Sequence, residues 1–188
     1  MKSKVQGPRS KVGAASRVAL TVLLAFALAD RIAAALAAPV PVEDLAKRAD
    51  TVVHGKVAAL ECTRDPAGRI FTRVELDVAE VWKGKPVRGF TLVLAGGVLG
   101  ARKVAVVGGP EYRLGEEVVV FTRRNASGEP VTLDLAQGKF TVEAAQASGT
   151  KHVANCVLGG PAEKSGYRLP TQVPLELSEL RRRVEAAR

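Results

Sequence analysis

Aromatic side chains and histidine are both scarce in this chain of 188 residues. Phe, Trp and Tyr together make up 4% of it, and only two histidines are present, His54 and His152. Proteins that hold single-stranded nucleic acid stack bases on aromatic side chains, so the shortage argues against that class of binding. A zinc site needs three or four ligands. We therefore expect neither a metal nor another cofactor, and we interpret His54 as a partly exposed strand residue.

No apolar run in the sequence matches the roughly 20 residues that a membrane-spanning helix requires. The clearest one, residues 18–29, follows a basic stretch and precedes small residues up to 38. This order of basic, apolar and small segments is the layout of a secretory signal peptide. Ala-Leu-Ala motifs at 35–37 and, less favourably, at 27–29 fit the signal peptidase, and the alternative is an uncleaved anchor. We predict that 1–37 is a signal peptide, that the product is periplasmic or secreted, and that no membrane span remains.

The excess of positive charge lies mostly in this leader. The whole chain has 28 basic and 19 acidic residues, a formal net charge of +9. Residues 1–37 hold six of the basic residues and one acidic residue, so 22 and 18 remain, a net charge of +4. The remaining basic residues are scattered. Because nucleic-acid binding leaves a clustered basic footprint, we expect no nucleic-acid partner.

Cysteine is nearly absent, and the only two are Cys62 and Cys156. Exported chains fold in an oxidising compartment, where two cysteines commonly form a bridge. A disulfide between them would close a long loop and stabilise the fold by about 4 kcal/mol in the chain-entropy description. The alternatives are two free thiols, or pairing between two chains.

Alternation of apolar and charged residues is the strongest structural signal. Within 70–82, the residues from Thr72 to Val78 alternate between an apolar and a charged face, which indicates a strand buried on one side only. Further strands are predicted at 51–60, 89–95, 117–122, 131–135 and 139–143, and an apolar run at 104–107 could pair as another. Short strands joined by turns predict a mainly β protein, a small antiparallel OB-like β-barrel. Its core should include Val74, Leu76, Val78, Val118 and Val120.

Helical patterns flank these strands. Residues 42–49 are amphipathic with the helical period, and 175–188 place Leu177, Leu180 and Val184 on one stripe after a candidate N-cap at Ser178. Residues 144–174 show no period. The expected organisation is a signal peptide at 1–37, a linker and short helix at 38–50, the barrel at 51–143, a loop-rich extension at 144–174 and a C-terminal helix at 175–188.

Several motifs in 49–143 suggest a family. They are Ala-Asp-Thr-Val-Val-His-Gly-Lys-Val at 49–57, Val-Trp-Lys-Gly at 81–84, Gly-Glu-Glu at 115–117 and Gln-Gly-Lys-Phe at 137–140. Together they resemble the netrin-like domain, as in tissue inhibitors of metalloproteinases, and are similar to bacterial exported proteins of unassigned function. The resemblance implies an OB-type barrel. It does not imply protease inhibition, because the inhibitors chelate the protease zinc with an N-terminal cysteine, whereas this chain has none before Cys62.

Few residue groups suggest catalysis. His152 and Cys156 are spaced as two ligands or a catalytic pair could be, but no third group is near them in the sequence. Ser148 and Lys151 match the S-x-x-K motif of penicillin-binding folds without its two partner motifs. No residue is therefore assigned a catalytic role.

By elimination, the sequence favours an exported, non-enzymatic binding domain whose partner is a protein or a small ligand. The alternatives are an exported hydrolase that uses residues of 144–160, and a regulator of a secreted protease. Barrels of this type bind on one sheet face and its bordering loops. The glycine-rich stretch 96–110 is the predicted binding loop, with candidate residues Gly96, Gly97, Arg102, Lys103, Gly108 and Gly109.

Overall fold

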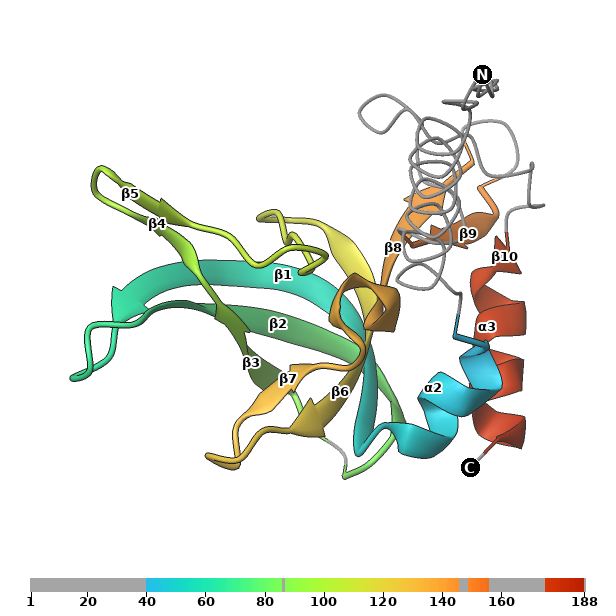
Figure 1. Cartoon of the computed structure of the whole chain (residues 1–188). Coiled ribbons are helices and arrows are strands. Elements are labelled where there is room, and N and C mark those ends of the chain that lie inside the picture. The colour runs from blue at the N-terminus through green and yellow to red at the C-terminus, as the bar shows by residue number, and fades with distance from the viewer. Residues whose placement is uncertain (1–39, 86, 146–148, 156–174, 188) are drawn as a thin grey trace, which may run out of the picture. The chain divides into compact units, whose positions relative to one another are not determined.

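A computed structural model describes residues 40–85, 87–145, 149–155 and 175–187, which all belong to one compact unit, Pro39–Arg188. It is mainly β, as predicted (Figure 1). The helical segments are Val42–Arg48 (α2), the 3-10 turn Leu135–Gly138 (η1) and Leu177–Ala186 (α3). The strands are Thr51–Arg64 (β1), Ile70–Lys83 (β2), Gly89–Ala95 (β3), Gly97–Leu99 (β4), Arg102–Val104 (β5), Glu117–Arg124 (β6), Pro130–Thr132 (β7), Lys139–Ala144 (β8), Lys151–Ala154 (β9) and Leu175–Glu176 (β10).

β1 is the strand around which the barrel is built. It pairs antiparallel with β2 along most of its length and with β6 over residues 51–56. β2 continues to β3 and β6 continues to β7, and the sheet curls until β3 lies beside β7. In the described structure no hydrogen-bonded ladder joins β3 to β7. The sheet thus has the curl of the predicted antiparallel barrel, but no ladder among the described residues closes it, and its two edges β3 and β7 meet at this seam by contact alone.

A glycine allows the tight approach of β1 and β2. The register of this pair shifts at His54/Gly55, and a Cβ atom on Gly55 would collide with the main-chain oxygen of Asp77. Register shifts of this kind increase the local bend and twist of a strand. Because of this bend, the first residues of β1 can pair with β6 while the rest of the strand continues with β2 in the barrel wall.

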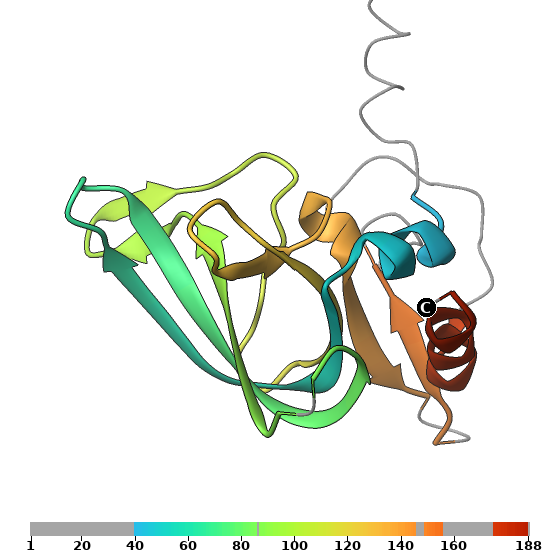
Figure 2. The same cartoon turned by 90° about the horizontal axis from the view of Figure 1, so that it is seen from below.

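Two apolar cores lie on the two faces of β1 and β6. The barrel core contains the predicted Val74, Leu76, Val118 and Val120, with Val78 partly buried against it. The outer core lies beneath the helices α2 and α3 and includes Trp82. Figure 2 shows α3 beside β9, outside the barrel. Alternate residues of β6 enter alternate cores because successive side chains of a strand point to opposite faces.

Some predicted elements differ from the structure. The strand expected at 131–135 ends at Thr132, because the chain folds back through the 3-10 turn η1 and Gly138 packs against the backbone of Leu133. The apolar run at 104–107 contributes only its first residue to β5, which forms a hairpin with β4. Glu176 rather than Ser178 precedes α3, and the Ser178 hydroxyl donates to the Glu176 carboxylate instead of capping the backbone.

The segment 144–174 contains a strand that the sequence did not reveal. β9 extends the sheet beside β8, where Val153 lies opposite Val142. Four residues are too few to show a period, and the burial of Val153 in the outer core explains why they become ordered as a strand. The predicted signal peptide at 1–37, Ser148 and Cys156 lie outside the described residues.

Candidate functional site

A cavity of about 840 Å³ borders the glycine-rich stretch that the sequence singled out. Its walls come from β3, from the β4–β5 hairpin, from the loop 105–113 and from β7 with the start of η1. We call it the hairpin cavity. It borders the barrel at the seam between β3 and β7, which no described ladder closes. Ligand sites in proteins commonly have volumes of this order.

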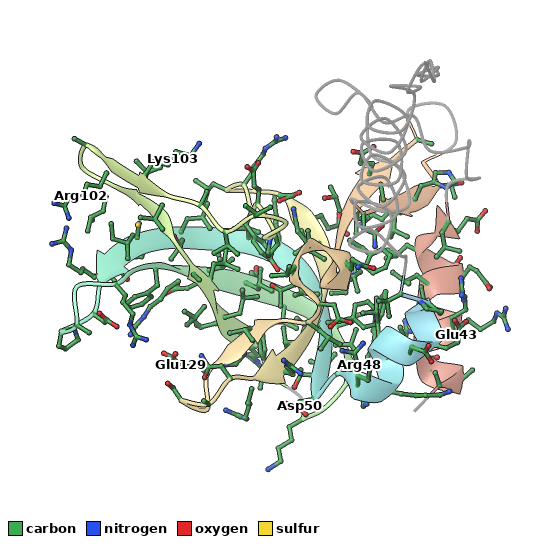
Figure 3. The ribbon with its side chains drawn as sticks, in the orientation of Figure 1. Glu43, Arg48, Asp50, Arg102, Lys103 and Glu129 are labelled. Carbon is green, nitrogen blue, oxygen red and sulfur yellow. The ribbon has the colours of Figure 1, made fainter. Side chains whose placement is uncertain are left out.

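The predicted binding residues divide between the cavity and its surroundings. Gly96, Gly97, Lys103 and Gly109 line the hairpin cavity, whereas Arg102 and Gly108 do not. Figure 3 shows Arg102 and Lys103 at the outer end of the hairpin.

Two of the glycines have a clear structural task. Gly96 has a φ of 89°, which disfavours other residues, and it lets β3 turn into β4. Gly97 follows with a φ of 143°, and a Cβ atom there would collide with Thr72 and with the Cys62 sulfur. These glycines therefore allow the hairpin to pack closely against Thr72 on β2 and Cys62 on β1, two residues that also line the cavity.

Exposed aliphatic side chains gather at this cavity. Five large aliphatic residues that line it remain between 40% and 61% exposed, namely Leu60, Val98, Val104, Val106 and Leu135. Elsewhere in the described residues only Val87, Val107 and Leu114 are large, apolar and comparably exposed. A concentration of exposed apolar groups around a concave site is the usual mark of a binding surface.

The charged residues of the lining differ in whether they already have partners. Asp134 accepts two hydrogen bonds from the Arg48 guanidinium, at 2.6 and 2.7 Å. Within the described part of the chain, the side chains of Lys103, Arg113 and Arg123 form no ion pair or hydrogen bond, and neither does the Glu111 carboxylate. Three cationic residues and one acidic residue of the lining therefore have no side-chain partner among the described residues.

Tyr112 forms a buried part of the wall. Its hydroxyl lies 2.9 Å from the Thr132 hydroxyl, and the Lys139 ammonium lies 4.9 Å from the centre of its ring. Burial raises the pKa of Tyr112 far above its usual range, so the phenol stays neutral. Burial also lowers the pKa of Lys139, although its hydrogen bond to Glu116 opposes that shift. These contacts anchor the loop that carries Arg113.

A smaller hollow of about 480 Å³ lies at the β1 bulge, beside a buried histidine. The prediction for His54 was wrong, because this side chain is only 7% exposed. Its Nε2 atom lies 2.7 Å from a Glu117 oxygen, and Lys151 donates to the same carboxylate. The ring of Trp82 packs against the imidazole, with centroids 5.7 Å apart. The sequence places Glu117 and Lys151 far from His54, so only the fold brings them together.

Opposing effects set the ionisation of Glu117. Burial disfavours its charged form, but the hydrogen bonds from Lys151 and His54 outweigh burial and hold the pKa of Glu117 below its ordinary value. The carboxylate thus fastens β9 to β6 and β1. Lys151, the lysine of the S-x-x-K motif, is committed to this contact.

The residues of the hydrolase alternative do not form a described site. His152 lies opposite Glu143 on β8 and Glu176 on β10. Ser148 and Cys156 are not among the described residues, so neither the S-x-x-K motif nor the predicted Cys62–Cys156 bridge can be located. Cys62 itself lines the hairpin cavity. No group of three or more metal-binding side chains occurs in the described ranges.

The chain matches no protein-family model and no curated protein. Among the described residues, no helix has the length and apolar character needed to cross a membrane.

Proposed function

We propose that this protein is an exported, non-enzymatic binding domain that holds a largely apolar ligand in the hairpin cavity. The observation that carries the proposal is the convergence of five exposed aliphatic side chains on the glycine-rich segment. An exposed apolar lining gains free energy when a ligand covers it, by roughly 25 cal/mol for each Å² removed from water. In this proposal the resemblance to netrin-like domains supports the barrel fold and not the choice of ligand.

An uncharged fluorescent probe, N-phenyl-1-naphthylamine, tests this function. We expect its fluorescence to rise on binding, and the double variant Val98→Ser/Val104→Ser to weaken binding about tenfold. Covering the exposed halves of two valines contributes about 1.5 kcal/mol or more. Val87→Ser is the matched control, because Val87 is 40% exposed but lies outside the lining. Equal loss in both variants, or no binding by the unchanged protein, would refute the proposal.

Export is the second part of the proposed function, and it rests on the basic, apolar and small segments of residues 1–37. Cleavage before Ala38 removes this leader. Intact-mass measurement on the product recovered from periplasm or medium checks it. A product that still contains 1–37 would show that the leader is retained.

A further inference from the structure

We propose that the ligand of the hairpin cavity is a single-chain anionic amphiphile, an aliphatic chain that ends in a carboxylate. This inference rests on the proposed function and adds the chemical class of the ligand. The apolar lining would cover the chain, while Arg113 and Arg123 would bind the carboxylate, with Lys103 at the rim.

The lining favours an aliphatic chain over an aromatic molecule. Tyr112 is the one aromatic residue among the described residues that line the cavity, and its ring is already covered by the Lys139 ammonium. The rest of the apolar wall is made of branched aliphatic side chains, alanine and proline. Aromatic ligands gain from offset or edge-on contacts with aromatic side chains, and this cavity offers no free ring for them.

The charges favour an anionic end group. Asp134 is neutralised by Arg48, so among the described residues of the lining Glu111 is the only carboxylate without a partner, beside the three cationic residues Lys103, Arg113 and Arg123. An apolar ligand that covered these cations would remove water from them, and an unpaired desolvated charge is costly. A carboxylate compensates because a guanidinium can donate two hydrogen bonds to it. A cationic ligand would suffer both desolvation and repulsion, so the site discriminates against it.

Three amphiphiles with the same tail provide the test. Isothermal titration at pH 8 compares dodecanoate, dodecanol and dodecyltrimethylammonium below their aggregation concentrations. We expect dodecanoate to bind at least tenfold more tightly than either of the others. The double variant Arg113→Gln/Arg123→Gln should lose at least tenfold in dodecanoate affinity and keep its affinity for N-phenyl-1-naphthylamine. Arg88→Gln is the matched control, an exposed arginine outside the lining.

The outcomes separate this inference from the proposed function. If the three amphiphiles bind equally while the uncharged probe binds, the ligand class is wrong and the cavity still binds apolar molecules. If neither probe nor amphiphile binds, the proposed function itself fails.

Phosphatidylglycerol vesicles test the other source of an anionic lipid. Co-sedimentation that is lost on Arg102→Gln, outside the lining, would point to a membrane surface and overturn the inference. Circular dichroism melting of each variant confirms that it is folded, so a loss of affinity can be assigned to the site.

Discussion

Truncation of Leu76 to alanine probes the barrel core directly. Leu76 is 2% exposed and lies between Val57 on β1 and Phe90 on β3. The substitution removes three carbon atoms, and at about 0.8 kcal/mol for each buried methylene the transfer loss alone is about 2.4 kcal/mol. The ladders on both sides of β2 limit how far the wall can collapse, so a residual cavity adds to the cost. We expect a loss of about 3–5 kcal/mol, within the range for buried leucines.

Urea denaturation measures this loss. Trp82 is the only tryptophan and is 2% exposed, so its fluorescence reports unfolding without a label. The midpoint should fall with little change in slope, because a stability change alone leaves the slope unaltered. Glu75→Ala, one residue away on the exposed face, serves as the control and should stay within about 0.5 kcal/mol. A loss below about 0.5 kcal/mol for Leu76→Ala would place this side chain on the surface and refute the register of β2.

Two further sets of substitutions and a thiol count test other parts of the structure. Because the pKa of Glu117 is lowered in the folded state, its contribution to stability is present above about pH 4.5 and is lost as the pH falls through the folded pKa. Glu117→Gln should therefore lower the melting temperature at pH 7 and matter progressively less below pH 4.5; an equal effect at both pH values would contradict this. Gly97→Ala should weaken probe binding more than Gly100→Ala, whose added Cβ meets open space; equal effects would show that the β3–β4 turn does not shape the cavity. Thiol counting on the denatured, unreduced protein should find no free thiol if Cys62 and Cys156 are bridged, whereas two per chain would exclude the bridge and a dimer on non-reducing gels would indicate pairing between chains.

The barrel could be predicted because its strands carry strong local patterns. The alternation from Thr72 to Val78 depends on the pleat of a single strand, and it identified the buried face of β2 without knowledge of its neighbours. β9 could not be predicted in this way, since its order depends on β8 and the outer core. The buried position of His54 depends on partners that lie far away in the sequence.

The glycine-rich stretch indicated where a cavity could form but not what completes it. Glycines mark turns in any context, so the sequence could point to 96–110 as a loop. Arg123 and Leu135 enter the lining only because β6, β7 and η1 fold back toward the hairpin. The exposure of Val98 and Val104 could not be predicted either, because an apolar residue in a strand is expected to be buried.

The position of α2 against α3 has a consequence for the order of folding. Arg183 on α3 binds the Glu43 carboxylate on α2 through two hydrogen bonds, so residues 140 positions apart join the two helices that cover the outer core. Contacts of such long sequence separation form late, since the intervening chain must first be ordered. The barrel core draws its residues from 53 to 120 and does not need α3. As the chain emerges, the barrel wall can thus assemble first, and the helical layer is completed only when residues up to 183 are free.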